Sequence, residues 1–489
     1  MKWQVLGSVL IVCVGTVLSG CSVGPLYKRP DVAMPAKWTE TASQSGAPAD
    51  AAPSVWPAAE WWHGFGSAKL DELMAEARRA NDDLAGAIAR VQEADAQARI
   101  AGAPLLPSVG LAGDASRSQA SKTTGLGNGK PFVDDSGFSV HNNLSASLTA
   151  SYEIDFWGKN RSALRAAEEN AVASRYDREV VGLATVVATA NAYFQVLTAQ
   201  DRLQAGRENI QSATRVLNLI QQRLNAGTAS ALDTAQQESL VNTQRAAIPP
   251  LEQTLTQNRN ALALLLARSP ESVRIRGGSL RSISYPRVTP GLPSELLTQR
   301  PDIRKAEANL AAANANVENA RAKMLPSITL TGEGGYQSAI LKTLLRPESM
   351  FFNLAAGLTQ PIFDGGKLQG NLDQQKGLQD EKLQTYRKAV ISGFVDVENA
   401  LDAIRQTALR ERLQRDVVTS SQRAFDISEQ RLREGTVDLV TVLLTQQTLY
   451  QAQDVLAQAR LAHAQAIVSL YQALGGGWLP KPVEASNAR

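Results

Sequence analysis

The chain has 489 residues, a formal net charge of +3 at pH 7 and only 5% aromatic residues. A net charge this small gives no broad basic field, so the composition excludes a general nucleic-acid-binding protein. Length alone would suggest about three ordinary domains, whereas the heavy use of alanine, leucine, glutamine and arginine favours long helices.

Residues 1–20 predict a lipoprotein signal peptide. Lys2 supplies a positive start, and Val5–Leu18 is an apolar stretch too short to span a bilayer comfortably. Leu18-Ser19-Gly20-Cys21 then forms a lipobox, so cleavage before Cys21 would leave that cysteine as the first mature residue, ready for acylation. The alternative is an ordinary secretory signal with a chance cysteine. Because Cys13 is removed with the signal, the mature chain would hold one cysteine and no internal disulfide.

Residues 21–66 are expected to form one lipidated segment, in which Ser22–Pro57 is rich in proline, alanine and serine. Such a composition favours an extended tether that lies on a surface over a packed element. Several acyl chains on Cys21 would together anchor this tether stably in a membrane, whereas a single chain would not.

Residues 67–268 make up a first structural unit. Apolar spacing predicts a helix over Ser67–Ala103, which Pro104 and Pro107 end. Alternating residues from Ser108 onward predict a strand. The polar, glycine-rich stretch Ser116–Val140 predicts an exposed loop.

The clearest strand signal is Leu144–Phe156, in which apolar and polar residues alternate. A strand of this length extends about 40 Å at roughly 3.3 Å per residue, enough to cross a bilayer when tilted. Its polar face, with Ser145, Ser147 and Thr149, is expected to line water, and its apolar face to meet lipid. A soluble sandwich is the alternative, but each hairpin is embedded in long helices with no other strands to pair with.

Gly158–Ala226 contains no proline and predicts one uninterrupted helix about 100 Å long. Apolar and small residues recur in it at three- and four-residue spacing, as in a coiled-coil seam. Gly227 is placed to end this helix. Ala231–Arg268 predicts the returning helix, with a kink at Pro249-Pro250.

The second half of the chain repeats the first. Asp83–Val109 matches Asp302–Ile328 without a gap at an offset of 219 residues, and Gln222–Thr228 recurs as Gln430–Thr436 at an offset of 208. Internal repeats favour stacked or ring-like assembly over a single compact core. The repeat sets three more boundaries: a linker over 269–293, a second structural unit over 294–474 and a C-terminal tail over 475–489.

The second unit contains the same elements in the same order. Alternation predicts strands that include Ile328, Leu330 and Tyr336, and then Phe352–Leu358. A long helix is predicted over Gly366–Glu434 and a returning helix over Leu439–Leu474.

Two hairpins give four strands, which cannot close a barrel. An unpaired strand edge cannot face lipid, because each unsatisfied backbone group costs several kcal/mol there. Two copies would supply eight strands and a barrel filled by side chains, whereas three would supply twelve and leave a lumen. The chain is therefore expected to oligomerise.

Five motifs follow one another along nearly the whole mature chain. They are Cys21-Ser-Val-Gly-Pro-Leu-Tyr-Lys-Arg-Pro30, Trp61-Trp62-x-x-Phe65, Arg300-Pro301-Asp302-Ile303-Arg304, Leu325-Pro326-Ser327 and Ala473-Leu474-Gly475-Gly476-Gly477-Trp478. Together they resemble the signatures of the TolC-type outer-membrane factors, and most closely those of the NodT-like efflux lipoproteins.

The resemblance implies a mainly α-helical fold with a membrane β-barrel. It implies a homotrimer in which each chain gives four barrel strands and long coiled helices that form a periplasmic α-barrel. The segments 21–66, 269–293 and 475–489 would form an equatorial belt. The protein would be lipid-anchored in the outer membrane, in contact with its lipid, and would extend into the periplasm.

The function implied is a passive exit duct for drugs or other small molecules in a tripartite efflux system. Its partners would be a periplasmic adaptor (a membrane fusion protein) and an inner-membrane transporter of the RND type. The alternative is the exit duct of a type I protein secretion system. A non-transporting lipoprotein, such as an adaptor or adhesin, is a third class, but it would not need two amphipathic strand pairs.

Adaptor docking is assigned by the resemblance to the two helix turns at the periplasmic end. The residues of these tips are Arg223, Leu224, Gly227 and Thr228 in the first turn, and Arg431, Leu432, Gly435 and Thr436 in the second. The turns are also the points that the predicted helices place farthest from the strands. Gly227 and Gly435 are equally well explained as helix C-caps.

The predicted gate departs from the family pattern. Just after the second turn, family members often carry Leu-Asp-Ala-Gln-Arg, whose charged residues help to close the pore. Here the sequence is Leu443-Leu444-Thr445-Gln446-Gln447, so Leu444 replaces the aspartate and Gln447 the arginine. Leu443, Leu444 and Gln447 therefore predict an apolar constriction that gates by dewetting.

No catalytic, cofactor or metal site is predicted. His63, His141 and His463 are far apart in the sequence, without metal-ligand spacing or a nucleophile–histidine pattern. Asp364-Gly365-Gly366-Lys367 shares only part of the phosphate-loop pattern. Its counterpart Phe156-Trp157-Gly158-Lys159 stands at the same strand-to-helix junction, so both predict a junction turn.

Overall fold

The computed structural model describes residues 27–31, 38, 57–119, 126–127, 130–131, 140–275, 277–286 and 293–478. Cys21, the predicted signal peptide and the chain beyond Trp478 lie outside the described residues. The chain divides into two compact units. The strand unit contains Gln92–Val172 and Ala308–Gln384, and the helical unit contains Asp31–Val91, Ala173–Glu307 and Thr385–Arg489.

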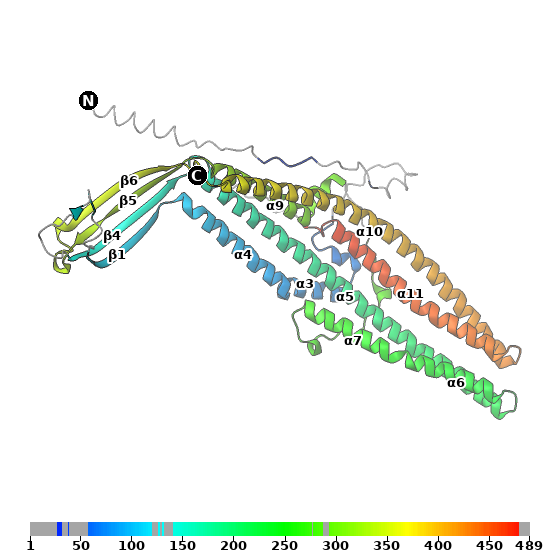
Figure 1. Cartoon of the computed structure of the whole chain (residues 1–489). Helices are drawn as coiled ribbons and strands as arrows, with labels where there is room; N and C mark the ends of the chain where they lie inside the picture. Colours follow the sequence, from blue (N-terminus) through cyan, green and yellow to red (C-terminus); the bar gives the residue numbers. More distant parts are fainter. Residues whose placement is uncertain are drawn as a thin grey trace. The chain divides into compact units, whose positions relative to one another are not determined.

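The strand unit contains a four-stranded antiparallel sheet and the adjoining ends of four helices (Figure 1). Its order is β1-β4-β5-β6, with β1 over Ser108–Gln119, β4 over Val140–Ile154, β5 over Ser327–Ser338 and β6 over Met350–Thr359. The predicted hairpins are confirmed, and β4 and β5 join them into one sheet. The predicted loop Ser116–Val140 is too long, because β1 continues through Gln119 and β4 begins at Val140. Within it, β2 (Leu126–Gly127) pairs with β3 (Lys130–Pro131).

At each strand-to-helix junction, an aspartate caps the N-terminus of the helix that follows. The Asp155 carboxylate accepts hydrogen bonds from the backbone N–H groups of Asn160 and Arg161, each at 2.9 Å. In the second repeat, the Asp364 carboxylate accepts from Gly366 at 3.0 Å and Leu368 at 2.8 Å. The amide groups that would hold a phosphate are therefore bonded to the chain's own aspartate, as the predicted junction turn requires.

Long helices form most of the rest of the chain. Helix α5 spans Lys159–Asn225 and α10 spans Lys367–Glu434, 67 and 68 residues that confirm the two predicted long helices. The returning helices are α6 (Ala231–Ala246) with α7 (Ile248–Leu265), and α11 (Leu439–Ala473). The remaining helices are α3 (Ala68–Ala80), α4 (Asp82–Gly102), α8 (Leu296–Gln299) and α9 (Pro301–Ala322), with short 3₁₀ turns over 61–65, 103–105, 270–272, 280–282, 293–295, 341–343 and 347–349.

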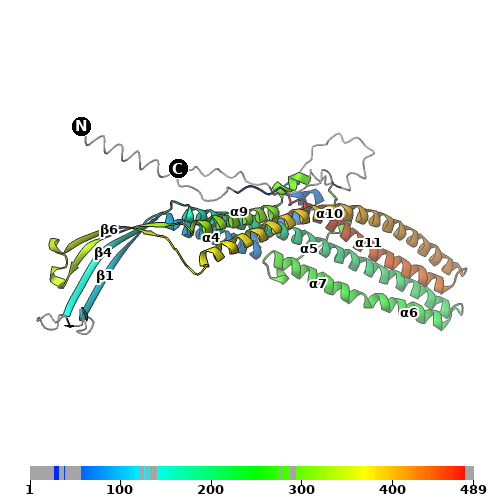
Figure 2. The same cartoon turned by 45° about the horizontal axis from the view of Figure 1, so that its top comes forward.

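The helices of the helical unit run side by side, as Figures 1 and 2 both show for α5, α10, α11 and the α6–α7 pair. Helix α6 ends at Ala246 and α7 begins at Ile248, directly before Pro249-Pro250, which confirms the predicted kink. One stretch of α5 is long and apolar enough to cross a membrane, but more than half of it is buried. Its apolar side chains are used in packing between helices.

The prediction of one helix over Ser67–Ala103 is wrong, because Asn81 interrupts it in an extended conformation. Its side-chain oxygen accepts a hydrogen bond from the Leu84 N–H at 3.0 Å and so caps α4. Its side-chain nitrogen donates to the Leu265 carbonyl at 3.0 Å. The helix breaks here because a buried asparagine bonds both to the next turn and to a residue far along the chain.

The largest core cluster lies in the helical unit and contains aromatic residues from both halves of the chain. Trp61 stacks on Tyr471 with ring centroids 4.5 Å apart, and Phe65 packs against Phe194 at 5.1 Å. Val273, Ile275 and Leu280 of the linker join the same cluster. The expectation that Trp61 and Trp62 form a buried anchor is confirmed, since both are buried.

Arg300 of the Arg-Pro-Asp motif ties three helices together. Its guanidinium bonds to Asp302 at 2.6 Å, to Asp396 of α10 at 3.0 Å and to the carbonyl of Ala473, the last residue of α11, at 3.1 Å. Burial on its own would lower the pKa of Arg300, but the hydrogen bonds and charges of Asp302 and Asp396 raise it. The motif therefore stabilises the packing of α9, α10 and α11.

Candidate functional site

One face of the sheet is apolar across all four strands. Residues directly opposite one another on paired strands share a face, and the register aligns Leu111 with Leu148, and Leu148 with Gly334, which is opposite Phe352. The apolar members are Val109, Leu111, Leu144, Ala146, Leu148, Ala150, Tyr152, Ile154, Ile328, Leu330, Tyr336, Met350, Phe352, Leu354, Ala356 and Leu358. Most of the large ones are exposed. A continuous apolar surface of this kind is typical of a membrane-facing sheet.

The other face of the sheet is polar. It carries Ser145, Ser147 and Thr149 on β4, and Thr329, Thr331 and Glu333 on β5. Ser147 donates a hydrogen bond to the Glu333 carboxylate at 2.8 Å. The two predicted faces of β4 and β5 therefore lie on opposite sides of the sheet, with the polar residues of both strands on the same side.

Two edges of the sheet have no partner within the described residues. Strand β1 pairs with β4 alone, and β6 pairs with β5 alone. An open edge next to a lipid-facing surface leaves backbone groups unsatisfied. The sheet of one chain is thus incomplete as a membrane-spanning structure.

The two predicted tips are alike in geometry. Gly227 and Gly435 adopt φ of 75° and 76°, the left-handed region that favours glycine. Each turn closes by two backbone bonds: Gly227 to the Leu224 carbonyl and Thr228 to the Arg223 carbonyl in the first, with the equivalent pair in the second. This is the Schellman pattern, so both glycines act as C-caps.

The tips are joined to each other within the chain. The Arg223 guanidinium donates to the Leu432 carbonyl of the other tip, and to the Thr228 carbonyl of its own at 3.5 Å. Arg431, Gly227, Thr228, Gly435 and Thr436 are exposed, and Arg223 and Leu224 are half-buried. Sequence reasoning did not anticipate the link that Arg223 makes.

Leu432 differs from the other tip residues, because its side chain is only 2% exposed. It packs in a cluster below the tips with Val216, Ile220, Phe425 and Leu439. The Leu432 side chain therefore packs between the helix pairs, and its place among the docking residues stays a prediction.

The predicted gate residues differ in their exposure. Leu443 is half-buried and packs against the cluster below the tips. Leu444 is 60% exposed, and Gln447 is also exposed. Within one chain, Leu444 and Gln447 are thus available for contact with another molecule or copy, and Leu443 supports them.

A buried polar network lies beside the gate residues, and the sequence did not predict it. The Gln446 side chain, which is fully buried, bonds to Gln237 of α6 at 3.3 Å and to the Tyr450 hydroxyl at 3.2 Å. Tyr450 in turn donates to the Asn209 carbonyl of α5 at 3.1 Å. Burial raises the pKa of Tyr450. The network joins α5, α6 and α11. Because glutamine is usually a surface residue, nothing in the sequence around Gln446 indicated that it is buried.

Charged groups also fix the helices near the tips. Glu429 of α10 accepts hydrogen bonds from Arg215 of α5 at 3.2 Å and from Arg433 at 2.5 Å. Asp438 caps α11 by accepting from the Thr441 N–H at 2.9 Å. Hydrogen bonds from Thr441 lower the pKa of Asp438. Both turns are therefore ordered by their own side chains.

No group of three or more histidine, cysteine, aspartate or glutamate residues placed to hold a metal ion occurs in the part of the chain that the structure describes. His63 contacts Asp71 and Glu60, and His463 contacts Glu411, so these two histidines lie next to separate carboxylates.

Comparisons with known proteins agree with this geometry. A family described as outer membrane efflux protein matches residues 73–268 and 292–476. The pyoverdine export outer membrane protein OpmQ of Pseudomonas aeruginosa is 40% identical over 465 residues, which cover 94% of this chain and 95% of OpmQ. The toluene efflux pump outer membrane protein TtgF of Pseudomonas putida is 33% identical over 485 residues, 98% of this chain and 99% of TtgF.

Among solved structures, the CmeC outer membrane channel of Campylobacter jejuni is similar with a TM-score of 0.84 and 25% identity. The alignment covers 94% of this chain and 95% of CmeC. The match therefore extends over both repeats and includes the strand sheet and the helices.

Proposed function

Because the chain belongs to the outer membrane efflux protein family and is a TolC-like outer-membrane channel of an efflux system, we propose that three copies assemble into its working form. Each copy would supply its four strands to a twelve-stranded barrel in the outer membrane. The helices of the three copies would form one tunnel through the periplasm. A solute would pass through both without chemical change.

The observation that carries this proposal is the amphipathic sheet with two open edges. Its apolar face suits lipid and its polar face suits water, but one copy cannot satisfy the edge backbone groups. Pairing β6 of one copy with β1 of the next would satisfy both edges. A twelve-stranded ring leaves a lumen, whereas an eight-stranded one is filled by side chains.

We propose the two tips as the surface that meets a periplasmic adaptor, which would connect the channel to an inner-membrane transporter of the RND type. The exposed residues there are Arg431, Thr228 and Thr436, next to the two capping glycines. Support comes from the link between the tips: because Arg223 bonds to the Leu432 carbonyl, the two turns present one fixed surface.

For the closed state we propose an apolar constriction made by Leu444 of each copy, with Gln447 beside it and Leu443 behind it. Leu444 is exposed in the single chain, so contact with its equivalents across a threefold axis would remove apolar surface from water. At about 25 cal/mol per Å² the closure amounts to a few kcal/mol. A docking adaptor can overcome an energy of that size.

We propose small molecules as the transported class. The relatives named for export of pyoverdine and toluene handle compounds of this size. A type I secretion duct for unfolded protein is the competing function. Deletion of the gene should raise susceptibility to small toxic compounds under the small-molecule proposal, and should abolish secretion of a protein under the competing one.

Cys21 would carry acyl chains that anchor the mature chain to the outer membrane. The strands supply their own insertion, so lipidation would aid targeting without creating the channel. Replacement Cys21→Ala should abolish incorporation of labelled palmitate and leave trimer formation intact. Loss of the trimer despite normal export to the periplasm would contradict this role.

The channel function is tested by conductance in planar bilayers. Purified protein should form discrete pores, with small currents in the closed state and larger ones in Leu444→Ser. Absence of pores in both proteins, with the trimer intact, would refute the duct and favour a non-transporting lipoprotein.

A further inference from the structure

Helix α11 carries four glutamines at intervals of seven residues along one face. Gln451, Gln458, Gln465 and Gln472 are named here the amide ladder. Because seven residues are close to two helical turns, the four side chains lie in one row along the helix, about 30 Å from end to end. Gln451, Gln458 and Gln472 are exposed and Gln465 is half-buried.

Every exposed residue of α11 is uncharged. The charged residues of the helix are paired. Asp454 lies on the ladder side, accepts a hydrogen bond from Gln458 at 2.6 Å and bonds to Arg202 of α5 at 2.6 Å. Arg460 and His463 approach Glu411 of α10 at 3.7 and 2.8 Å. The neighbouring α10, by contrast, exposes Arg412, Arg415 and Asp416 within a few residues. On the ladder side of α11, the charge of Asp454 is therefore balanced by Arg202.

The linker between the repeats covers the opposite side of α11. The Tyr285 ring lies 4.4 Å from the His463 ring, and its hydroxyl donates to the Arg460 carbonyl at 3.4 Å. At about 100° per residue, the ladder positions lie roughly 120–180° around the helix from His463. The ladder therefore occupies the face away from the linker.

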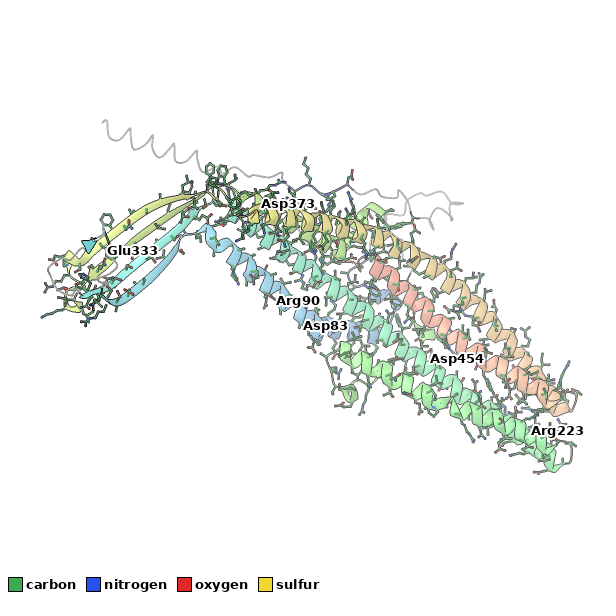
Figure 3. The ribbon with its side chains drawn as sticks, viewed as in Figure 1. Asp83, Arg90, Arg223, Glu333, Asp373 and Asp454 are labelled. Atoms are coloured by element: carbon green, nitrogen blue, oxygen red, sulfur yellow. The ribbon has the colours of Figure 1, made fainter. Side chains whose placement is uncertain are left out.

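This face is also hollowed. A cavity of about 490 Å³ lies between α5, the α6–α7 break and α11. Gln447 and Gln451 form part of its wall, together with the Arg202–Asp454 ion pair, and Pro250 and Leu251 give it an apolar side. Figure 3 shows Asp454 on α11, where it helps to line this cavity. A cavity of this size with a few polar groups is large enough for a drug-sized molecule.

We propose that the amide ladder lines the transport path and that its side chains form short-lived hydrogen bonds with uncharged polar groups of the passing solute, such as amides and hydroxyls. This inference rests on the proposed duct. A glutamine side chain both donates and accepts hydrogen bonds and carries no charge. A row of them can exchange bonds with a solute at successive positions, and the cavity at Gln451 gives room for such contact.

The placement is tested by cysteine modification of conducting trimers. Gln458→Cys is treated in a planar bilayer with positively and negatively charged methanethiosulfonate reagents, and Ser282→Cys, on the exposed linker, is the matched control. Modification at position 458 should cause a loss of conductance and should shift the reversal potential in opposite directions for the two reagents. Modification at position 282 should change neither. If Gln458→Cys forms normal pores and neither reagent alters their current, the amide ladder does not line the transport path.

The recognition is tested with a probe of the proposed chemistry, N,N′-diacetylchitobiose, an uncharged disaccharide with amide and hydroxyl groups. It should cause brief current blockades in the unmodified channel, and their dwell time should fall several-fold in the double variant Gln451→Leu, Gln458→Leu. Ser282→Ala should leave the dwell time unchanged. Equal dwell times in the double variant and the unmodified channel would overturn the hydrogen-bonding role. Absence of any pore in the unmodified protein would refute the duct itself, and this inference with it.

Discussion

A charge placed on the apolar face of the sheet should destabilise the trimer far more than the same charge placed on the adjacent, polar-face residue of the same strand. Leu148 lies near the middle of β4 on the apolar face and is 54% exposed, while Thr149 lies on the polar face. We therefore compare Leu148→Arg with Thr149→Arg. Because the two positions are consecutive, strand length, depth in the membrane and pairing partners are nearly the same.

The free-energy cost of Leu148→Arg follows from the environment of position 148. An arginine on the lipid-facing side near the bilayer midplane destabilises a membrane sheet by about 2–4 kcal/mol. Each copy of the channel carries the change, and about 1.4 kcal/mol corresponds to a tenfold change in an equilibrium constant. The equilibrium constant for folding of the sheet in the membrane should therefore fall by more than tenfold per copy. At position 149 the arginine would extend into water, and the substitution loses only an exposed hydrogen bond of 3.3 Å to the Gly110 carbonyl.

The assay is the amount of trimer in outer-membrane fractions, measured by immunoblot of unheated samples. Leu148→Arg should nearly abolish the trimer band, whereas Thr149→Arg and the volume control Leu148→Met should retain it. If Thr149→Arg reduced the trimer as much as Leu148→Arg, the assignment of the two faces would be wrong.

Three further outcomes are expected in the helical unit. Leu444→Ser should raise single-channel conductance with little effect on trimer stability, and unchanged conductance in both Leu444→Ser and Leu443→Ser would show that the constriction lies elsewhere. Gly435→Pro should impair complementation of efflux at normal outer-membrane levels, because proline can neither adopt a φ of 76° nor donate the bond to the Leu432 carbonyl; full complementation would argue against a role for this tip. Because hydrogen bonds lower the pKa of Asp438, its cap is fully stabilising above the unfolded value of about 3.9 and is lost as the pH falls through the lower folded value. Hydrogen exchange of the first turn of α11, corrected for intrinsic rates, should accelerate over that range in the parent chain but not in Asp438→Asn, and equal profiles would contradict the cap's role.

The elements with a regular local pattern were predicted well from the sequence. Alternation along Leu144–Phe156 gave the strand and both of its faces, because side chains in a strand point to opposite sides in turn. The absence of proline and the glycine at the end gave both long helices to within two residues. The repeat also predicted the matching turns at Gly227 and Gly435.

What sequence reasoning missed depends on contacts between distant residues. Asn81 breaks a helix because it bonds to Leu265, and nothing near Asn81 in the sequence reveals that partner. Gln446 is buried because Gln237 and Tyr450 satisfy its amide, although glutamine is usually a surface residue. Leu432 belongs to the core below the tips because Val216 and Ile220, far from it in the sequence, pack against it. A local pattern specifies an element, but it does not specify which of its side chains another element will cover.

The central claim is that one chain supplies only a third of a closed membrane sheet. The most direct test is the mass of the purified protein in detergent, measured by light scattering with correction for bound detergent or by native mass spectrometry. A mass of three protomers is expected, since three copies of the β1-β4-β5-β6 sheet give a barrel with a lumen. A stable monomer or dimer that still forms conducting pores would contradict the claim.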